Sequence, residues 1–183
     1  AACDVRDENQ IKALVTKAES HFGPVEIFCS NAGVLTLDEP GWSAAGATNE
    51  SWQLAWDVHV MAHVYAARAC LPGMIERGHG ILLNTVSAAG LLNQIGGAPY
   101  SASKHAAIGF AESLAITHQE QGIQVAALCP QGVKSPMVAG AGDMSDGGPA
   151  GVDGMLSADD VASAAIAGLE AGDFLILPHP SVA

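Results

Sequence analysis

Tyr100 and Lys104 are a pair whose residue types and spacing suit acid–base chemistry. They are four positions apart near the start of a predicted helix, so they share a face about one turn apart. A Lys ammonium beside a phenol favours the phenolate, and we therefore expect Lys104 to lower the pKa of Tyr100 from about 10. Tyr100 would then donate or accept a proton near neutral pH. The same spacing also occurs at partly exposed helix ends without catalytic residues, so the pair needs support from its surroundings.

Three predicted strands each end in a polar or glycine-rich segment. Ser87 lies just past the end of one strand, thirteen residues before Tyr100. Open α/β sheets bind their ligands at the carboxyl ends of the strands. Each segment alone is also typical of an ordinary turn, but three of them at one edge indicate a site. The other two segments are Asn31-Ala32-Gly33 after the preceding strand and Pro130-Gln131-Gly132-Val133 after the following one.

The elements that must position these residues alternate between helix and strand. Apolar spacing and Gly or Pro at the boundaries predict them. We therefore predict an α/β fold, a doubly wound parallel sheet with helices on both faces. The long helix 50–77 is apolar almost all round and should be covered on two sides. The predicted elements are helix 7–21, strand 25–30, helix 50–77, strand 81–86, helix 100–121, strand 123–128, helix 157–171 and strand 174–177.

Length and composition fit a single domain over residues 1–183. The chain is 49% apolar and 14% charged, which excludes a disordered chain. Seven basic against 19 acidic residues give a net charge of −12, which repels phosphate backbones and excludes nucleic acid as a partner. No apolar stretch is long enough to cross a membrane. The four cysteines are far apart, which predicts reduced thiols and a cytoplasmic protein rather than a disulfide framework.

In order and spacing, these segments resemble those of the short-chain dehydrogenase/reductase family of the classical type. The resemblance covers nearly the whole chain. It implies a Rossmann-type fold, NAD or NADP as the cofactor, and hydride transfer between that cofactor and a small-molecule ketone or secondary alcohol. The matching segments are Asp4-Val5, Asn31-Ala32-Gly33, Ser87, Tyr100-Ser101-Ala102-Ser103-Lys104 and Pro130-Gln131-Gly132-Val133-Lys134-Ser135.

The resemblance also implies a role for each matching residue. Tyr100 would be the general acid or base at the substrate oxygen, and Ser87 would hold that oxygen. Lys104 would lower the pKa of Tyr100 and bind the nicotinamide ribose. The implied adenosine-side contacts are Asp4 and Val5 at the adenine, with Asn31, Ala32 and Gly33 as the wall beside it. The implied nicotinamide-side contacts are Pro130, Gly132, Val133 and Ser135.

His59 is the first departure from the family pattern, because the family usually has an asparagine at this place. That asparagine supports a water linked to the Lys in a proton relay. Histidine donates and accepts hydrogen bonds and titrates near pH 6.5, so His59 would either replace the asparagine as a catalytic residue or impair the relay. His59 and His63 also form an H-x-x-x-H pair, but no acidic third ligand is evident, and no metal site is predicted.

The second departure is the absence of the family's glycine-rich first turn together with the first β-α-β unit. The chain starts where the third strand of the family ends. About 50 residues of the family pattern are therefore missing before that point. That turn receives the pyrophosphate at a helix N-terminus. Two explanations stay open: an excerpt of a longer dehydrogenase, or a short non-catalytic relative that acts as a binding or scaffold subunit. Either way, strand 25–30 should expose an apolar edge.

Two expectations concern the surroundings of the site. The glycine-rich segment 139–154 lies where the family often places a mobile substrate lid, although a surface loop fits as well. Helices 50–77 and 100–121 should lie on one face of the sheet. We expect them to pair with the same helices of another subunit, which would give a homodimer or homotetramer.

Overall fold

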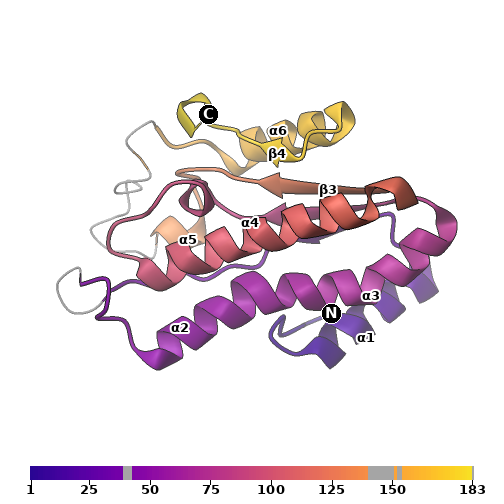
Figure 1. The fold of residues 1–183 in the computed structure, drawn as a ribbon, viewed down its shortest axis with the longest axis horizontal. Coiled ribbons are helices and arrows are strands. Elements are labelled where there is room, and N and C mark those ends of the chain that lie inside the picture. Colours follow the sequence, from indigo (N-terminus) through magenta and orange to yellow (C-terminus); the bar gives the residue numbers. More distant parts are fainter. Residues whose placement is uncertain (39–42, 140–150, 152–153, 183) are drawn as a thin grey trace.

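The computed structural model of the chain describes residues 1–38, 43–139, 151 and 154–182 (Figure 1). At its centre is a four-stranded sheet whose strands pair in chain order and are all parallel. The predicted parallel sheet is therefore confirmed. Its strands are β1 (Ile27–Ser30), β2 (Gly80–Thr85), β3 (Ile123–Leu128) and β4 (Leu175–Ile176).

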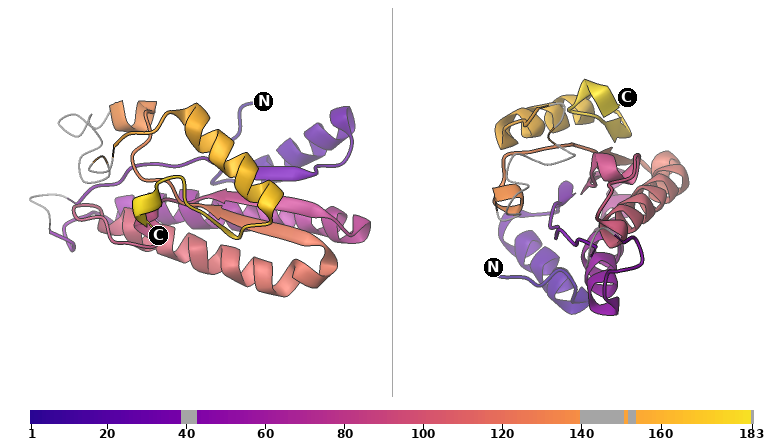
Figure 2. Two further views of the ribbon diagram at one scale, coloured as in Figure 1. Left: turned by 90° about the horizontal axis from the view of Figure 1, so that it is seen from above. Right: turned by 90° about the vertical axis from the view of Figure 1, so that its left-hand side faces the viewer.

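Helices cover both faces of this sheet, which makes it a Rossmann-like, doubly wound structure. Figure 2 shows α6 on the side of the sheet away from α3 and α4. The α-helices are α1 (Glu8–Phe22), α2 (Asn49–Trp56), α3 (Ala62–Arg77), α4 (Ala98–His118), α5 (Pro136–Ala139) and α6 (Ala158–Ala171). A π-helical segment, η1 (Asp57–Met61), joins α2 to α3. Short 3-10 turns are η2 (Ala88–Gly90), η3 (Gln119–Gln121) and η6 (Pro180–Val182).

Local sequence signals account for the helix boundaries. The Asp7 side chain accepts hydrogen bonds from the amides of Asn9 and Gln10 and so begins α1. Ser157 and Asp160 form a capping box that begins α6. Gly122, at a φ of 79°, turns the chain from η3 into β3, and a side chain there would also collide with the carbonyl of Gly78. The turns before β2 and β3 are therefore in direct contact.

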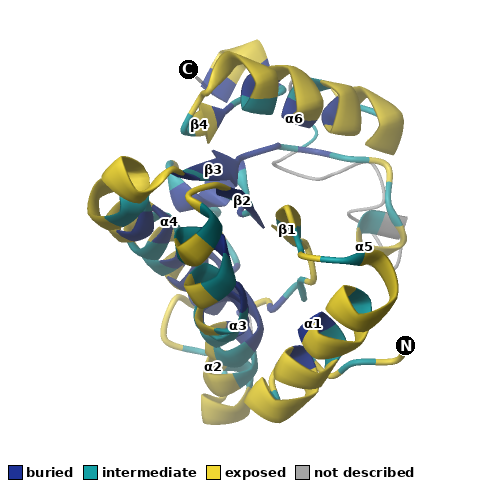
Figure 3. Cartoon of the chain, turned by 90° about the vertical axis from the view of Figure 1, so that its right-hand side faces the viewer, coloured by how far each residue is buried: buried dark blue, intermediate teal, exposed yellow. Residues whose placement is uncertain are grey.

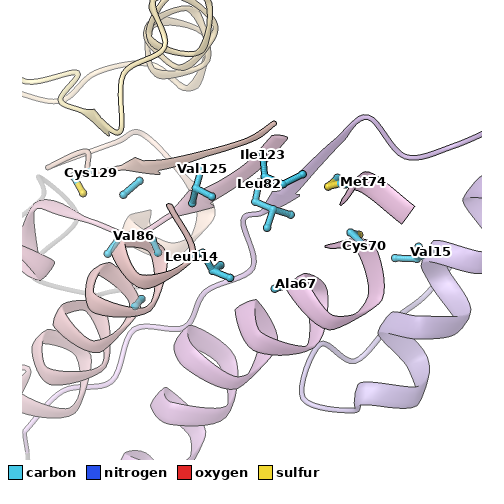
Figure 4. Close-up of a cluster of buried hydrophobic side chains, with 13 residues drawn as sticks. Val15, Ala67, Cys70, Met74, Leu82, Val86, Leu114, Ile123, Val125 and Cys129 are labelled. Atoms are coloured by element: carbon cyan, nitrogen blue, oxygen red, sulfur yellow. The ribbon is translucent and has the colours of Figure 1, made fainter. Parts of the chain in front are cut away.

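The core consists of two apolar layers, one on each face of the sheet. The larger layer lies where α1, α3 and α4 pack on β2 and β3, with Leu82 and Val125 near its middle and Met74 toward the end where Val15 lies (Figure 4). The smaller layer joins α6 to the opposite face through Val161, Leu128 and other residues. Figure 3 shows β2 and β3 as the most buried part of the chain. These layers hold the carboxyl ends of the strands in place.

The position of α6 gives this half of the fold an unusual connection. The chain moves in the same direction along the sheet from β2 to β3 and from β3 to β4. Because α4 covers one face and α6 the other, the two crossovers have opposite hand, although almost all such crossovers are right-handed. The second crossover thus places α6 on the face of the sheet that α3 and α4 do not cover.

Several sequence expectations can be compared with the exposed surface. The predicted helix 50–77 is interrupted by η1, and Trp52 and Trp56 near its start are 37% and 44% exposed. In this chain, that end of the helix is therefore not covered on two sides as expected. Ile27 on β1 is 49% exposed, as predicted for an apolar edge strand. Most of the segment 139–154 lies outside the described residues. No described helix is both long and apolar enough to span a membrane.

Candidate active site

Three loops meet at the carboxyl edge of the sheet because the strands that precede them are in register. Ser30 pairs with Asn84, and Thr85 pairs with Leu128. Hydrogen bonds continue past the strand ends, from the Val86 amide to the Leu128 carbonyl and from the Ala88 amide to the Pro130 carbonyl, each 2.8 Å long. The segments that follow β1, β2 and β3 therefore lie together, as the sequence predicts.

Ser87 projects from this edge just after β2. Its backbone is extended, and its Oγ accepts a hydrogen bond from the Ala89 amide at 3.1 Å. Because the Oγ is the acceptor in that bond, the hydroxyl proton is left available for another partner. Ser87 lines the same cavity as Tyr100, and its hydroxyl interacts with the phenol.

The start of α4 positions Tyr100. Gly97, the residue before the helix, has no side chain to cap it, and Pro99 occupies the first turn. Asp38 supplies the cap from another loop, because its Oδ1 accepts a hydrogen bond from the Ala98 amide at 2.9 Å. The Asp38 amide also donates to the Gly96 carbonyl at 2.8 Å. The loop after β1 thus holds the first turn of the helix that carries Tyr100.

Lys104 lies one turn further along α4 and is almost completely buried. Its Nζ donates a hydrogen bond to the Thr85 carbonyl at 3.1 Å and lies 5.7 Å from the centroid of the Tyr100 ring. Burial lowers the pKa of Lys104 to about 8, because a desolvated ammonium is disfavoured. Lys104 therefore changes charge within the ordinary working range of an enzyme.

The predicted lowering of the pKa of Tyr100 is wrong for this structure, because burial outweighs any effect of Lys104. Burial raises the pKa of Tyr100, since the phenolate loses its hydration, and the interaction with Ser87 opposes this only in part. The Lys104 ammonium lies over the Tyr100 ring, with its Nζ 5.7 Å from the ring centroid. Tyr100 is thus a protonated phenol at neutral pH, which suits a proton donor.

His59 is buried beside Tyr100, in the π-helical segment η1. Its Nε2 accepts a hydrogen bond from the Val34 amide at 3.1 Å, and its Nδ1 lies 2.8 Å from the Ser103 Oγ. Its ring meets that of Tyr100 edge to face, with centroids 5.3 Å apart. Burial, with the charges of Lys104 and His63 as smaller causes, lowers the pKa of His59 to about 3. The ring is therefore neutral at physiological pH.

One large cavity joins most of the predicted site residues. Its volume is about 680 Å³, and Ser87, Tyr100 and Lys104 line one wall of it. Asn31 and Gly33 also line it. So do the predicted nicotinamide-side residues Pro130, Gly132, Val133 and Ser135. These segments are far apart in the sequence but border one space that is large enough for part of a dinucleotide and a small substrate.

The predicted adenosine-side residues are less closely grouped. Val5 and Ala32 line a second, smaller cavity of about 160 Å³. Asn31 lines both cavities. Asp4 lines neither of these cavities; its carboxylate pairs with Arg6 at 2.6 Å, and this hydrogen bond lowers the pKa of Asp4 to about 2. The residues present thus fit the nicotinamide end of a cofactor, and Asp4 is turned toward Arg6.

Sequence reasoning missed several residues that shape the site. Ser103 belongs to the matching segment 100–104 but was given no role, although its spacing of three from Tyr100 places it one turn along the same helix. Thr85 contributes only a carbonyl, which carries no sequence signal. Asp38 lies 60 positions before Ala98, and nothing in the sequence links the two residues.

The fold and site together define an α/β protein of the nucleotide-binding type with a Ser, Tyr and Lys cluster at the carboxyl edge of its sheet. The model of the short chain dehydrogenase family matches residues 1–146. The chain therefore belongs to the short-chain dehydrogenase family.

Known relatives agree with this assignment. The chain is 35% identical over 161 residues to the 1-deoxy-11-beta-hydroxypentalenate dehydrogenase of Streptomyces exfoliatus, a match that covers 87% of this chain and 56% of the relative. It is 33% identical over 141 residues to the human epidermal retinol dehydrogenase 2, and this match covers 75% of this chain and 44% of the relative. The chain thus spans about half the length of the curated relatives it matches.

Solved structures show the same arrangement. A short chain dehydrogenase/reductase from Burkholderia phymatum, determined in complex with NAD, matches all of this chain and 71% of its own, with a TM-score of 0.85 and 27% identity. Levodione reductase matches 97% of this chain and 74% of its own, with a TM-score of 0.86 and 23% identity, which shows the fold alone.

Proposed function

We propose that the intact protein is a nicotinamide-dependent oxidoreductase that interconverts a ketone and a secondary alcohol. The observation that carries the proposal is the placement of Ser87, Tyr100 and Lys104 on one wall of the cavity, next to the segment 130–135. A hydroxyl, a phenol and a buried ammonium at one point can bind a carbonyl oxygen and give it a proton.

The proposed chemistry follows from the state of each group. In the reducing direction, the Ser87 hydroxyl donates a hydrogen bond to the substrate oxygen and the Tyr100 phenol transfers its proton to that oxygen. The Lys104 ammonium, 5.7 Å from the Tyr100 ring centroid, stabilises the phenolate that results. When bound, NADH or NADPH would supply the hydride. In the oxidising direction the phenolate takes the alcohol proton.

NAD or NADP is the proposed cofactor. Gly132, Val133 and Ser135 line the same cavity as Lys104. The Lys104 ammonium has three donors and, among the described residues, one hydrogen bond, to the Thr85 carbonyl, so N–H groups remain for a ribose hydroxyl. A solved relative with 27% identity holds NAD, which supports this assignment. We propose that these cavity residues, together with Asn31 and Gly33, would bind the cofactor.

The proposed substrate is a small uncharged molecule with an apolar skeleton. Lys104 is the only charged side chain among the described residues that line the cavity, and Leu35 and Met137 line it together with Tyr100. An anionic group on the substrate would have no second cation to pair with inside this part of the cavity. The names of the two relatives above, a retinol and a hydroxypentalenate dehydrogenase, each contain an alcohol.

Calorimetric titration of the protein with NADH and then NADPH tests the proposal first. We expect one of the two to bind, and ketone reduction to follow when an apolar ketone is added. Tyr100→Phe should keep cofactor binding and lower turnover by about 10²- to 10⁴-fold, because a proton donor is lost. Unchanged turnover in this variant would reject the assignment of Tyr100. A folded protein that binds neither cofactor would favour a non-catalytic binding or scaffold subunit.

We also propose a homo-oligomer and a cytoplasmic location. The apolar side chains of Trp52 and Trp56 on α2 and Ile116 on α4 are exposed, and Figure 3 shows exposed residues on the outward faces of both helices. Pairing of α2–α3 and α4 with the same helices of a second subunit would cover these side chains. The cytoplasmic location rests on the four cysteines, all of which are free thiols.

A further inference from the structure

Gln131 follows β3 and lines the large cavity next to the proposed catalytic residues. The Ala88 amide donates a hydrogen bond to the Pro130 carbonyl at 2.8 Å, so the segments after β2 and β3 lie side by side. Ser87 precedes Ala88 in the chain, and Gln131 follows Pro130. Because neighbouring strands are about 4.8 Å apart, Gln131 is a close neighbour of Ser87. Both residues line the cavity that Tyr100 lines.

The backbone at Gln131 is held by hydrogen bonds to two other parts of the chain. The Gln131 amide donates to Nδ1 of His179 at 3.1 Å, and His179 is buried. The Leu156 amide donates to the carbonyl of Gly132, the next residue, at 3.0 Å. A fixed backbone limits the positions that the Gln131 side chain can reach. Less conformational entropy is therefore lost when this side chain binds a ligand.

The carboxamide of Gln131 has a buried oxygen without a partner. Its Oε1 has no hydrogen-bond partner among the described residues. Buried polar atoms are almost always hydrogen-bonded, and a buried acceptor without a partner is unfavourable. Because Gln131 lines the cavity, a ligand in the cavity can donate a hydrogen bond to this side chain and remove the penalty.

A hydroxyl group is the ligand chemistry that fits this carboxamide. A hydroxyl both donates and accepts hydrogen bonds, so it can donate to Oε1 or accept from the amide nitrogen of Gln131. A carboxylate or phosphate would place a negative charge beside a neutral amide. Lys104 is the only cation among the described residues that line the cavity, and it serves the Tyr100 phenolate. The group at Gln131 is therefore a neutral hydroxyl.

We propose that Gln131 determines substrate specificity by binding a second oxygen of the substrate, which is a hydroxy ketone in the reducing direction and a diol in the oxidising direction. The carbonyl oxygen would lie at Ser87 and Tyr100, and the hydroxyl at Gln131. Because these side chains come from neighbouring strand ends, the hydroxyl is on a carbon next to the carbonyl carbon or one further away. This hydroxyl is neither oxidised nor reduced: one hydride still reaches the carbonyl carbon, and one proton passes from Tyr100 to the carbonyl oxygen. The inference rests on the proposed function, since it names the substrate class of the same site.

Reaction rates with matched ketones test the role of Gln131. The value of kcat/KM is measured for cyclohexanone, 2-hydroxycyclohexanone and 3-hydroxycyclohexanone. We expect the parent protein to prefer one of the hydroxy ketones to cyclohexanone by about tenfold or more, as one well-placed hydrogen bond provides. In Gln131→Met the side chain keeps its length but has no amide, and the preference should fall to about twofold or less. A parent protein without the preference, or a variant that keeps it in full, would overturn the proposal.

Gln94→Met is the matched control. Gln94 lines the same cavity from the loop between β2 and α4, where its amide donates to the Ser101 hydroxyl at 2.9 Å. The same change of side chain at Gln94 should leave the preference for the hydroxy ketone in place. If Gln94→Met lost the preference and Gln131→Met kept it, the hydroxyl would bind at Gln94 and the role of Gln131 would be wrong.

A binding measurement separates failure of this inference from failure of the proposed function. The side-chain amide of Gln131 gives a pair of NMR signals, which are identified by their absence from the spectrum of Gln131→Met. Titration with 1,2- and 1,3-cyclohexanediol, with and without the cofactor, should shift this pair, whereas cyclohexanol should not. If the parent protein reduces no ketone but a diol shifts the pair, the proposed function fails and the hydroxyl site stands. If the parent protein reduces ketones but neither diol shifts the pair more than cyclohexanol does, the role of Gln131 fails and the proposed function stands.

Discussion

The Nζ of Lys104 on α4 donates a hydrogen bond to the backbone carbonyl of Thr85, the last residue of β2, at 3.1 Å. This bond joins the helix that carries Tyr100 to the edge of the sheet that carries Ser87. It also keeps an ammonium in a desolvated place, where its charge acts strongly on nearby groups. The geometry of the candidate site therefore depends on a side chain whose charge changes near pH 8.

Ketone reduction should slow above about pH 8. Lys104 loses its proton there, and the phenolate that forms on Tyr100 loses its nearby positive charge. Other site groups do not titrate in this range, because burial raises the pKa of Tyr100 and of Cys129 and lowers that of His59. The check is kcat/KM between about pH 6 and 10. In Lys104→Met, kcat/KM should be lower at all pH values and should not decrease further near pH 8. If the decrease near pH 8 persists in this variant, a group other than Lys104 causes it.

Replacing Asp38 by Ala should destabilise the start of α4. The variant removes the acceptor for the Ala98 amide, and loss of such a cap costs about 1 kcal/mol. Because Tyr100 is in the same turn, kcat should also fall. Asp38→Asn keeps an acceptor oxygen and should restore most of both losses. Urea unfolding and initial rates are the measurements.

Asp7→Ala is the matched control for Asp38. It removes a cap of the same kind from α1, close to the predicted adenosine-side residues Asp4 and Val5 but on another element than Tyr100, where Asp7 accepts from the Asn9 and Gln10 amides. The rates are therefore compared at saturating cofactor. Stability should fall by a similar amount, while kcat stays unchanged. If both variants lowered kcat equally, the effect would come from global stability rather than from the position of Tyr100.

The protein should lose stability as the pH falls below 6.5. Burial lowers the pKa of His59 to about 3 and that of His63 to about 4, from an ordinary value of 6.5. The unfolded chain therefore binds two protons that the folded chain does not bind, and each histidine lowers the stability by about 2 kcal/mol between pH 7.5 and 5. Above pH 6.5 this penalty is absent. Urea unfolding at pH 7.5 and 5 measures it.

His63→Leu tests the contribution of one of these histidines. Neither ring nitrogen of His63 has a hydrogen-bond partner among the described residues, so an apolar side chain of similar size should stabilise the protein at pH 7.5 by about 1–3 kcal/mol. The gain should be larger at pH 5, because one of the two titrating groups is gone. A variant with the full pH dependence of the parent would exclude His63 as a source of it.

Trp56→Lys should shift the protein toward the monomer. The Trp56 side chain is 44% exposed on α2, and a charge there opposes burial in a helix-pairing interface. Sedimentation velocity of the parent and the variant measures the change. Phe22→Lys is the control, since Phe22 is 89% exposed but lies at the end of α1, outside the proposed interface. A monomeric parent protein would reject the proposed oligomer.

Local signals in the sequence were sufficient for most of the elements. The run 123–128 was predicted as a strand with the bounds that β3 has, and the predicted helix 157–171 agrees with α6 and its cap Ser157. These features depend on neighbours within a few positions, namely short apolar runs, caps and glycine turns. The predicted meeting of Ser87, Tyr100 and the segment after β3 also follows from the sequence, because parallel strands bring their carboxyl ends to one edge.

The sequence by itself thus determined the order of elements, the parallel sheet and the motif residues at its edge. Tertiary structure decided how those residues behave. The bonds from Asp38 to Ala98, from His59 to Val34 and from Lys104 to Thr85 join positions between 19 and 60 residues apart, and no local pattern predicts them. The tertiary structure also decided the direction of the pKa shift of Tyr100. Desolvation depends on how much of the folded chain surrounds a group, and burial raised a pKa that the Tyr–Lys spacing alone predicts to fall.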